Sequence, residues 1–331
     1  QAGKEIDERL QTLGAKRLLP RIDADVAFEQ AADSWSKEVI EQSRQLIPEH
    51  SDNVISLAGA ATQKRSDRFN PFQGTIIDNR RITTDQAIAK IHHIAIEIDP
   101  QLVRYQPGDA LGILSKNSPT LVNEIIEAIG LNADARVTID QEQLPLSQAL
   151  QEKLELTLLH PSVVSQWAQL SNSAALLSLA DDARKLREYA QDRQLIDLIH
   201  EYPAEIDAET LVSTLQSLQP RLYSISSSQQ VSDDEVQLTV SAVSYQAYGR
   251  EHLGSASNYL TDRIEQDDLI SVYVAENTHF RLPENNDTPI IMIGAGTGIA
   301  PYRAFLQQRE AEQARGKNWL IFGNRNFKHD F

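Results

Sequence analysis

The sequence predicts a multidomain protein of the α+β and α/β classes: an antiparallel β-barrel with a helical insert, then the start of a doubly wound α/β domain. Three observations support this fold class. The chain has 331 residues, which is too many for one ordinary hydrophobic core. Strand-like segments lie on both sides of a mostly helical, polar stretch at about 118–218. Residues 289–322 then have the pattern of an apolar strand, a glycine-rich turn, a helix and a second apolar strand.

The N-terminal residues have the pattern of a helix, a short apolar strand at 17–22 and an amphipathic helix at 27–47. Two helices and one strand bury too little surface for a core, so we expect 1–47 to be the end of a larger domain. Residues 48–68 are rich in Ser, Asp, Gly, Ala, Gln and Lys without periodicity, which is typical of a linker. Because Met292 is the only methionine, we expect the chain to be a piece of a longer protein.

Apolar alternation and turn residues predict strands throughout the section 69–283, on either side of the helical insert. The insert opens with Ser118 and Pro119, an N-cap and a first-turn proline. The expected strands are 74–78, 94–98, 105–114, 221–226, 235–245 and 269–274, and the expected helices are 118–130, 174–191, 210–218 and one after Gly254. In the last section, 284–331, the expected elements are a strand at 289–293, a turn at 294–298, a helix at 299–314 and a strand at 318–322.

Composition excludes several classes of protein. A net charge of −16 argues against broad nucleic-acid binding, which needs a basic surface. The longest notable uncharged stretch, 288–302, is broken by Gly and Pro and is shorter than the ~20 residues of a membrane span. The absence of cysteine excludes thiolate chemistry and fits a cytoplasmic protein. No His, Asp or Glu set has metal-ligand spacing, and the neighbours His92 and His93 point to opposite faces of a strand, so we predict no metal site.

The sharpest local motif is the run Gly-Ala-Gly-Thr-Gly at 294–298, between a strand and a helix. Such a turn presents backbone N–H groups and a helix N-terminus to an anion, for example a diphosphate. The surroundings are basic, with six Lys and Arg residues against three Asp and Glu residues in 301–331. The spacing differs from the general G-x-G-x-x-G fingerprint, so a glycine-rich turn that binds nothing stays open as an alternative.

Two further motifs have residue types suited to phosphate. In Arg-Leu-Tyr-Ser at 221–224, strand alternation puts Arg221 and Tyr223 on one face. A guanidinium pairs well with phosphate and a phenol ring stacks on a flat ring, although exposed strand residues without a function have the same pattern. Gly-Ser-Ala-Ser at 254–257 opens a helix, where small residues either cap the helix or admit a phosphate.

In this order and spacing the three motifs resemble those of the ferredoxin–NADP reductase-like flavoproteins, and the insert resembles that of the diflavin reductases. The runs 280–283, 288–294 and 301–309 look most like the flavoprotein subunits of the NADPH–sulfite reductase family. The resemblance covers essentially the whole chain. It implies a flavodoxin-like FMN domain ending at 1–47, an FAD-binding domain over 69–283 and an NADP-binding domain starting at 284.

The resemblance also implies a role for each matching residue. Arg221 would bind the FAD diphosphate, Tyr223 would stack on the isoalloxazine ring, and Ser224, the expected catalytic residue, would lie near the flavin N5 atom. Tyr245 would reach the phosphate side of FAD. The expected cofactor-binding residues are Thr157, Arg221, Leu222, Tyr223, Ser224, Thr239, Val240, Ser241, Tyr245, Gly254, Ser255, Ala256 and Ser257 for FAD, and Gly296, Thr297 and Gly298 for NADPH.

The function implied by the resemblance is that of a cytoplasmic NADPH-dependent oxidoreductase, oligomeric at full length. Electrons would pass from NADPH through FAD and FMN to a haem- and iron–sulfur-containing sulfite reductase subunit, the hemoprotein or beta subunit. The FMN loops and part of the NADP site would lie outside this sequence, so we expect FAD but not FMN binding and poor NADPH oxidation by the chain alone. Two alternatives stay open: a flavoprotein with another electron acceptor, and a flavin-binding scaffold without turnover.

Overall fold

The computed structural model describes residues 7, 9–12, 14, 17–20, 29–46, 67–326 and 328–330. Contacts divide the chain into two compact units, Gln1–Ala61 and Thr62–Phe331. Of the linker predicted at 48–68, only the last two residues are described.

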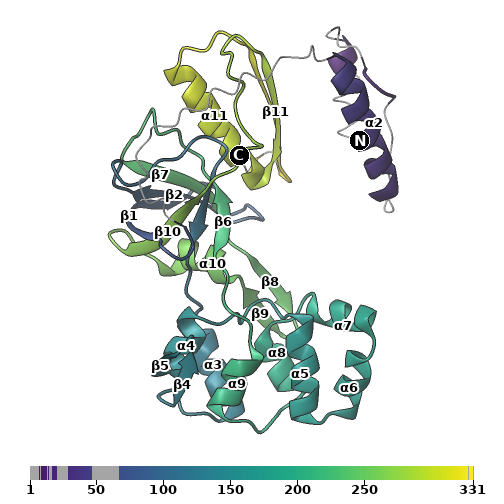
Figure 1. The fold of residues 1–331 in the computed structure, drawn as a ribbon, viewed down its shortest axis with the longest axis vertical. Coiled ribbons are helices and arrows are strands. Elements are labelled where there is room, and N and C mark those ends of the chain that lie inside the picture. The colour runs from purple at the N-terminus through teal and green to yellow at the C-terminus, as the bar shows by residue number, and fades with distance from the viewer. Residues whose placement is uncertain are drawn as a thin grey trace. The chain divides into compact units, whose positions relative to one another are not determined.

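The first unit contains helix α2, Glu29–Leu46, which confirms the predicted second helix over its described residues (Figure 1). The strand predicted at 17–22 is wrong at 17–20, which form a bend, while 21–22 lie outside the described residues. The indole N–H of Trp35 donates to the carbonyl of Pro20 at 3.2 Å. The Pro20 carbonyl is therefore hydrogen-bonded by a side chain and not by a neighbouring strand.

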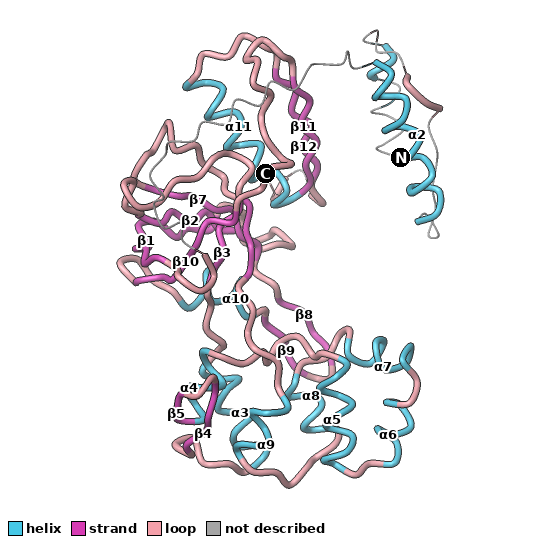
Figure 2. The backbone as a smooth tube through the Cα atoms, in the orientation of Figure 1, coloured by secondary structure: helices cyan, strands magenta, loops and turns pink. Residues whose placement is uncertain are grey.

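The second unit is built around a six-stranded antiparallel sheet in the order β6-β3-β10-β1-β2-β7 (Figure 2). The strands are β1 (Phe72–Arg81), β2 (Ile91–Glu97), β3 (Ala110–Ile113), β6 (Arg221–Ser224), β7 (Glu235–Ser241) and β10 (Leu269–Ala275). Each was expected from the sequence within a few residues. Alternating residues such as Ile94, Ile96, Leu238 and Val240 are fully buried in one core, as period-two patterning predicts.

The chain just after β6 makes a short contact with β7, the other end strand. Ile225 forms an isolated antiparallel bridge with Leu238, and the Ser226 N–H donates to the Gln237 carbonyl at 2.8 Å. No ladder between β6 and β7 is detected in the described residues, so the predicted barrel stays a prediction and the sheet is what the structure shows.

The predicted insert is present as a separate helical layer with its own core, which includes Trp167 and Leu176. Its helices are α3 (Pro119–Ile129), α4 (Leu146–Glu152), α5 (Pro161–Ser171), α6 (Ala174–Ala180), α7 (Ala183–Ala190), α8 (Leu195–Glu201) and α9 (Ala208–Thr214). It also holds an unpredicted hairpin of β4 (Arg136–Ile139) and β5 (Glu142–Pro145). The single helix predicted at 174–191 is wrong, because Asp182 ends one helix region and its carboxylate accepts the N–H groups of Arg184 and Lys185 at the start of the next.

The strand expected at 235–245 also ends early. After β7 the chain enters a separate hairpin of β8 (Ser244–Ala247) and β9 (Arg250–Leu253). The helix predicted after Gly254 follows as α10 (Ser255–Asn258) and continues directly into the π-helical turn η1 (Tyr259–Arg263). The two form one helical segment, 255–263, which is called the 255–263 helix below.

The last section confirms the predicted β-α-β pattern. Strand β11 (Ile290–Ala295) leads through a 3₁₀ turn, η2 (Gly296–Ile299), into α11 (Ala300–Ala311), and β12 (Asn318–Gly323) pairs in parallel with β11. Helix α11 ends before the expected residue 314, and Gln313 just beyond it has a φ of 54°, outside helical geometry.

Candidate functional site

Strand β6 presents a cation beside an aromatic ring at one end of the sheet. Tyr223 is half-buried and packs against the sheet core, and burial raises the pKa of its phenol to about 12. Arg221 lies near it with an exposed side chain, and among the described residues its guanidinium has no hydrogen-bond or ion-pair partner. Leu222 and Ser224 are also exposed. The strand therefore offers an unpaired positive charge and a partly open ring face to a ligand.

Strand β7 holds the second predicted segment, 239–241, at the other end of the sheet. One edge of β7 pairs with β2, whereas on the other edge only Leu238 is bridged, to Ile225. This antiparallel register brings Ser224 alongside the 239–241 segment. The side chain of Val240 is fully buried in the core, so only its backbone can meet a ligand. On that edge Gln237 is already bonded, to the Ser226 N–H and the Ser227 hydroxyl. Beyond Leu238 no ladder is detected in the described residues, which leaves the edge at 239–241 open to a flat ring.

The 255–263 helix begins with the third predicted segment, 254–257, next to the chain that leaves β7. The Gly254 N–H donates to the Val243 carbonyl at 3.0 Å, and the Ser257 hydroxyl accepts from the Val243 N–H at 3.2 Å. The Ser255 hydroxyl donates to Asn117 at 2.9 Å, and both serines are buried. A Cβ on Gly254 would lie 2.6 Å from the Ser257 hydroxyl, so the close approach requires glycine.

The Asn258 side chain accepts from the Gly254 N–H at 3.0 Å, but among the described residues no side chain caps the first turn, so its N–H groups are left to face a ligand. A cavity of about 190 Å³ opens at this point and is lined by Thr157, Gly254 and Ser255 among others. It shares lining residues, including Arg263, with a neighbouring cavity of about 720 Å³. The structure therefore brings Thr157 together with the helix start, as the resemblance implied.

Arg263 lines both cavities, beside Lys90 in the larger one and Arg250 in the smaller one. Its Nη2 atom donates to the carbonyls of Lys116 and Ser255 at 2.7 and 2.8 Å. Its Nε atom is buried and has no hydrogen-bond partner in the part of the chain that the structure describes. Burial lowers the pKa of this guanidinium. A half-satisfied, partly buried cation beside uncapped helix N–H groups fits an anionic group such as a diphosphate.

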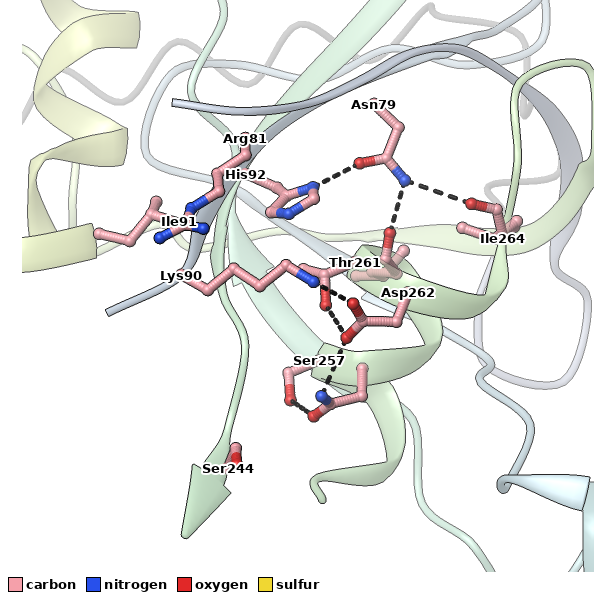
Figure 3. A network of polar contacts seen from close by, with 12 residues as sticks. Asn79, Arg81, Lys90, Ile91, His92, Ser244, Ser257, Thr261, Asp262 and Ile264 are labelled. Atoms are coloured by element: carbon pink, nitrogen blue, oxygen red, sulfur yellow. Dashed lines mark hydrogen bonds and ion pairs between the residues drawn. The ribbon is translucent and has the colours of Figure 1, made fainter. Parts of the chain in front are cut away.

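A polar network that borders the larger cavity holds the far end of the same helix (Figure 3). The side-chain amide of Asn79, on β1, donates to the carbonyls of Leu260 and Ile264 at 2.8 and 3.3 Å, which satisfies two groups at the helix C-terminus. Its carbonyl oxygen faces His92 Nδ1 at 2.8 Å, so Nδ1 carries the proton. Burial lowers the pKa of His92, in keeping with a neutral ring.

The side of the helix is held by an ion pair in the same network. Lys90, just before β2, pairs with Asp262, which also accepts from the Asn258 amide at 3.0 Å and the Thr261 hydroxyl at 2.9 Å. Burial of Asp262 acts against ionisation, yet the hydrogen bonds from Lys90 and Thr261 hold its pKa below the ordinary value. The sequence analysis indicated none of these groups. The bonds of Asn79 and the Lys90–Asp262 pair join residues from different elements, whereas the bonds from Asn258 and Thr261 to Asp262 lie within the helix.

Tyr245 does not line either cavity, and the predicted FAD contacts on β6 and β7 do not line them either. Ser244, Glu251 and Leu253 line the cavities from one face of the β8–β9 hairpin. Tyr245 lies on the opposite face, where its ring stacks on His252 with centroids 4.9 Å apart and an interplanar angle of 11°. The side chain of Tyr245 is 38% exposed, so part of it stays open to solvent.

The glycine-rich turn, Gly296–Ile299, has room for a ligand. Gly296 has a φ of 53°, which favours glycine, and a Cβ on Gly298 would meet nothing within 4 Å. Protein packing therefore does not explain Gly298. An open backbone without a side chain at a helix start fits the approach of a diphosphate. Thr297 lies in the same turn, which contacts β7.

Helix α11 holds the glycine turn next to the β6–β7 junction. Arg303 Nη1 donates to the Ser226 carbonyl at 2.6 Å and to the side-chain oxygen of Gln237 at 2.5 Å. The Ser228 N–H donates to the side chain of Gln307 at 2.9 Å. The predicted nucleotide turn and the predicted flavin strands are thus brought to one place.

The described residues contain no group of three or more His, Asp or Glu side chains arranged to hold a metal ion. They also contain no helix with the length and apolar character that crossing a membrane requires.

The comparisons with known proteins agree with this geometry. Residues 64–259 match the family described as "FAD binding domain", and residues 292–331 match "Oxidoreductase NAD-binding domain". The chain therefore belongs to the FAD-binding domain family and carries domains of a nicotinamide-dependent flavoprotein oxidoreductase.

Over its whole length the chain is similar to proteins named sulfite reductase [NADPH] flavoprotein alpha-component. It is 44% identical to that of Cronobacter sakazakii, 43% to that of Klebsiella pneumoniae and 42% to that of Escherichia coli K12. All of the chain but only 56% of each relative is covered, so the chain spans little more than half of their length.

Proposed function

We propose that this chain is the FAD-binding portion of an NADPH-dependent diflavin reductase that serves sulfite reduction. Electrons pass from NADPH through FAD and FMN to a haem- and iron–sulfur-containing sulfite reductase subunit, the hemoprotein or beta subunit. The observation that carries the proposal is the position of β7, whose open edge lies between the unpaired Arg221 on β6 and the glycine turn before α11. Flavin and nicotinamide groups must meet for electron transfer, and both predicted sites border this strand.

The protein's part in this function is binding and alignment, because a bound flavin supplies the redox chemistry. Arg221 pairs with the diphosphate, and Tyr223 offers its ring to the isoalloxazine. Ser224 lies near the reacting edge of the ring, which the 239–241 backbone borders. The uncapped start of the 255–263 helix adds N–H donors for the diphosphate.

We further propose the domain limits that the resemblance implies. Residues 1–47 are the end of an FMN domain and 48–68 a linker. Residues 69–283 form the FAD-binding domain with its insert at about 118–218, and 284–331 belong to the NADP-binding domain. The separate hydrophobic core of the insert supports its treatment as an inserted layer. In the whole protein we place the reaction in the cytoplasm of the cell, within an oligomer, without nucleic acid or membrane as a partner.

Flavin identification tests the proposal directly. The purified chain is reconstituted with FAD and separately with FMN, and the retained flavin is identified by chromatography and absorbance. We expect about one FAD per chain and no retained FMN. Stoichiometric FMN, or no flavin at all, contradicts the proposal.

A second measurement distinguishes the sulfite pathway from the two alternative functions, a reductase with another acceptor and a flavin-binding scaffold. The FAD-loaded chain and a full-length protein that contains it are each mixed with NADPH, and flavin bleaching is followed. Full-length protein that bleaches and then reduces sulfite only with its hemoprotein partner supports the sulfite pathway. Bleaching with transfer to another acceptor alone supports a different diflavin reductase, and FAD binding without bleaching in either protein supports a flavin-binding scaffold.

A further inference from the structure

A buried hydrogen bond between His252 and Asp197 joins the β8–β9 hairpin to the helical insert, next to Gln194 and Leu253 of the smaller cavity. His252, on β9, has no exposed surface, and its Nε2 atom lies 2.7 Å from a carboxylate oxygen of Asp197 on α8. A carboxylate only accepts, so Nε2 carries the proton. No sequence motif marked either residue, and their roles are outside the FAD contacts proposed above.

Asp197 is itself fixed in orientation by its own helix. The same carboxylate oxygen accepts the backbone N–H of Gln194 at 2.7 Å, at the start of α8. The side-chain amide of Gln194 then donates to the carbonyl of Leu253 at 2.9 Å, next to His252 on the hairpin. The hairpin is therefore bonded to α8 at two successive residues, and the imidazole ring has one defined position.

The imidazole ring of His252 packs against the ring of Tyr245 and so restrains its orientation. The two rings are stacked at 4.9 Å with an interplanar angle of 11°, and Tyr248 meets the same imidazole edge-on at 6.3 Å. Tyr248 is held in turn by Asp192, which accepts its hydroxyl at 2.7 Å, and by Arg193, whose guanidinium lies 4.1 Å from the ring centre. The two ring contacts of His252 thus join aromatic rings of the hairpin to the insert.

We propose that His252 and Asp197 are positioning residues for Tyr245, holding its ring in the orientation that an FAD molecule requires. This inference rests on the proposed function, in which Tyr245 contacts FAD. With one ring face against His252 and its hydroxyl beside the Gln194 side chain, Tyr245 keeps its other ring face for the cofactor. Asp197 of the helical insert thereby affects FAD affinity through His252, and neither side chain contacts the cofactor.

A mutant cycle on the whole chain tests the proposal, with FAD affinity measured by titration of the apoprotein. A stacked aromatic pair accounts for about a three- to tenfold change in affinity. We expect His252→Ala to weaken FAD binding by about that factor and Tyr245→Leu to weaken it at least as much. In the Tyr245→Leu background, His252→Ala should change affinity by less than about twofold, because its effect acts through the missing ring. The control is His200→Ala, an exposed histidine on the same helix as Asp197, for which we expect no change.

A conservative variant keeps the test valid if His252→Ala does not fold. The pair His252→Phe with Asp197→Asn retains a flat ring and a side-chain oxygen for the Gln194 N–H, and removes the buried charge. We expect it to bind FAD within about threefold of the unchanged chain. Equal affinity in His252→Ala, an undiminished effect in the Tyr245→Leu background, or failure of the Phe and Asn pair to restore binding overturns the inference. Lack of FAD binding by the unchanged chain contradicts the proposed function instead, so the two failures are distinguishable.

Discussion

Replacement of Asn79 by Ala should destabilise the FAD-binding unit far more than a surface mutation does. Asn79 makes three hydrogen bonds: two from its amide to the carbonyls of Leu260 and Ile264, and one with His92. Each bond contributes about 0.5–1.5 kcal/mol net, and the two helix carbonyls lose their side-chain donor. We therefore expect a loss of roughly 2–4 kcal/mol in the free energy of unfolding.

Urea-induced unfolding, followed by circular dichroism, measures this loss. The matched control is Asn285→Ala, since Asn285 is exposed and accepts a single local hydrogen bond, from the Asp287 N–H at 2.9 Å. The control should lose no more than about 0.5 kcal/mol, as surface substitutions usually do. His92→Ala, which removes one of the three bonds, should fall between the two. If Asn79→Ala is as stable as the control, the helix C-terminus does not depend on this side chain and the reasoning is refuted.

Three further predictions concern the cofactor sites and pH. Arg221→Ala and Tyr223→Ala should each weaken FAD binding several-fold or more in equilibrium titration. One change removes a charged partner and the other a stacking face worth about 0.5–1.5 kcal/mol. Unchanged affinity in both variants would show that these are exposed strand residues without a role in FAD binding. Gly298→Ala should leave thermal stability unchanged but weaken NADP(H) binding in calorimetry. Gly296→Ala should weaken binding and also lower stability, because its φ of 53° strains any other residue. Equal changes in stability in the two variants contradict this prediction. Because folding lowers the pKa of His92 below its ordinary value of 6.5, the unfolded chain takes up the proton first, so stability present above pH 6.5 should be lost as pH falls below it. His92→Gln should flatten that pH dependence in urea unfolding, and an unchanged slope would assign it to other groups.

The sequence predicted those elements whose pattern is local. The β-α-β section was correct because apolar strands, glycines and a helix-entry proline each leave a clear mark within a few residues. The unpredicted β4–β5 hairpin shows the limit of this approach. Its turn residues Asp140 and Gln141 have φ angles of 49° and 71°, and neither is the glycine by which such turns are usually detected.

The candidate site was predicted in part for the same reason. Glycines and a strand arginine are visible in the sequence, whereas the groups that hold them come from distant elements. Asn79 and Leu260 are 181 positions apart, and Asp197 and His252 are 55 apart. Only a folded sheet and insert bring such pairs together, so no periodicity or spacing could have indicated them. The position of Tyr245 on the far face of its hairpin is a result of the same kind.

The two ends of the 255–263 helix differ in a way that bears on the choice between capping and ligand binding. At its C-terminus, Asn79 satisfies two carbonyls. At its N-terminus, Ser255 and Ser257 are residue types that commonly cap helices, yet their hydroxyls bond to Asn117 and to Val243. In the part of the chain that the structure describes, no side chain accepts from the first turn. Plain capping therefore does not explain why small residues open this helix. Free N–H groups beside Arg263 and a cavity are what a bound anion would satisfy, which supports the diphosphate of FAD at this end.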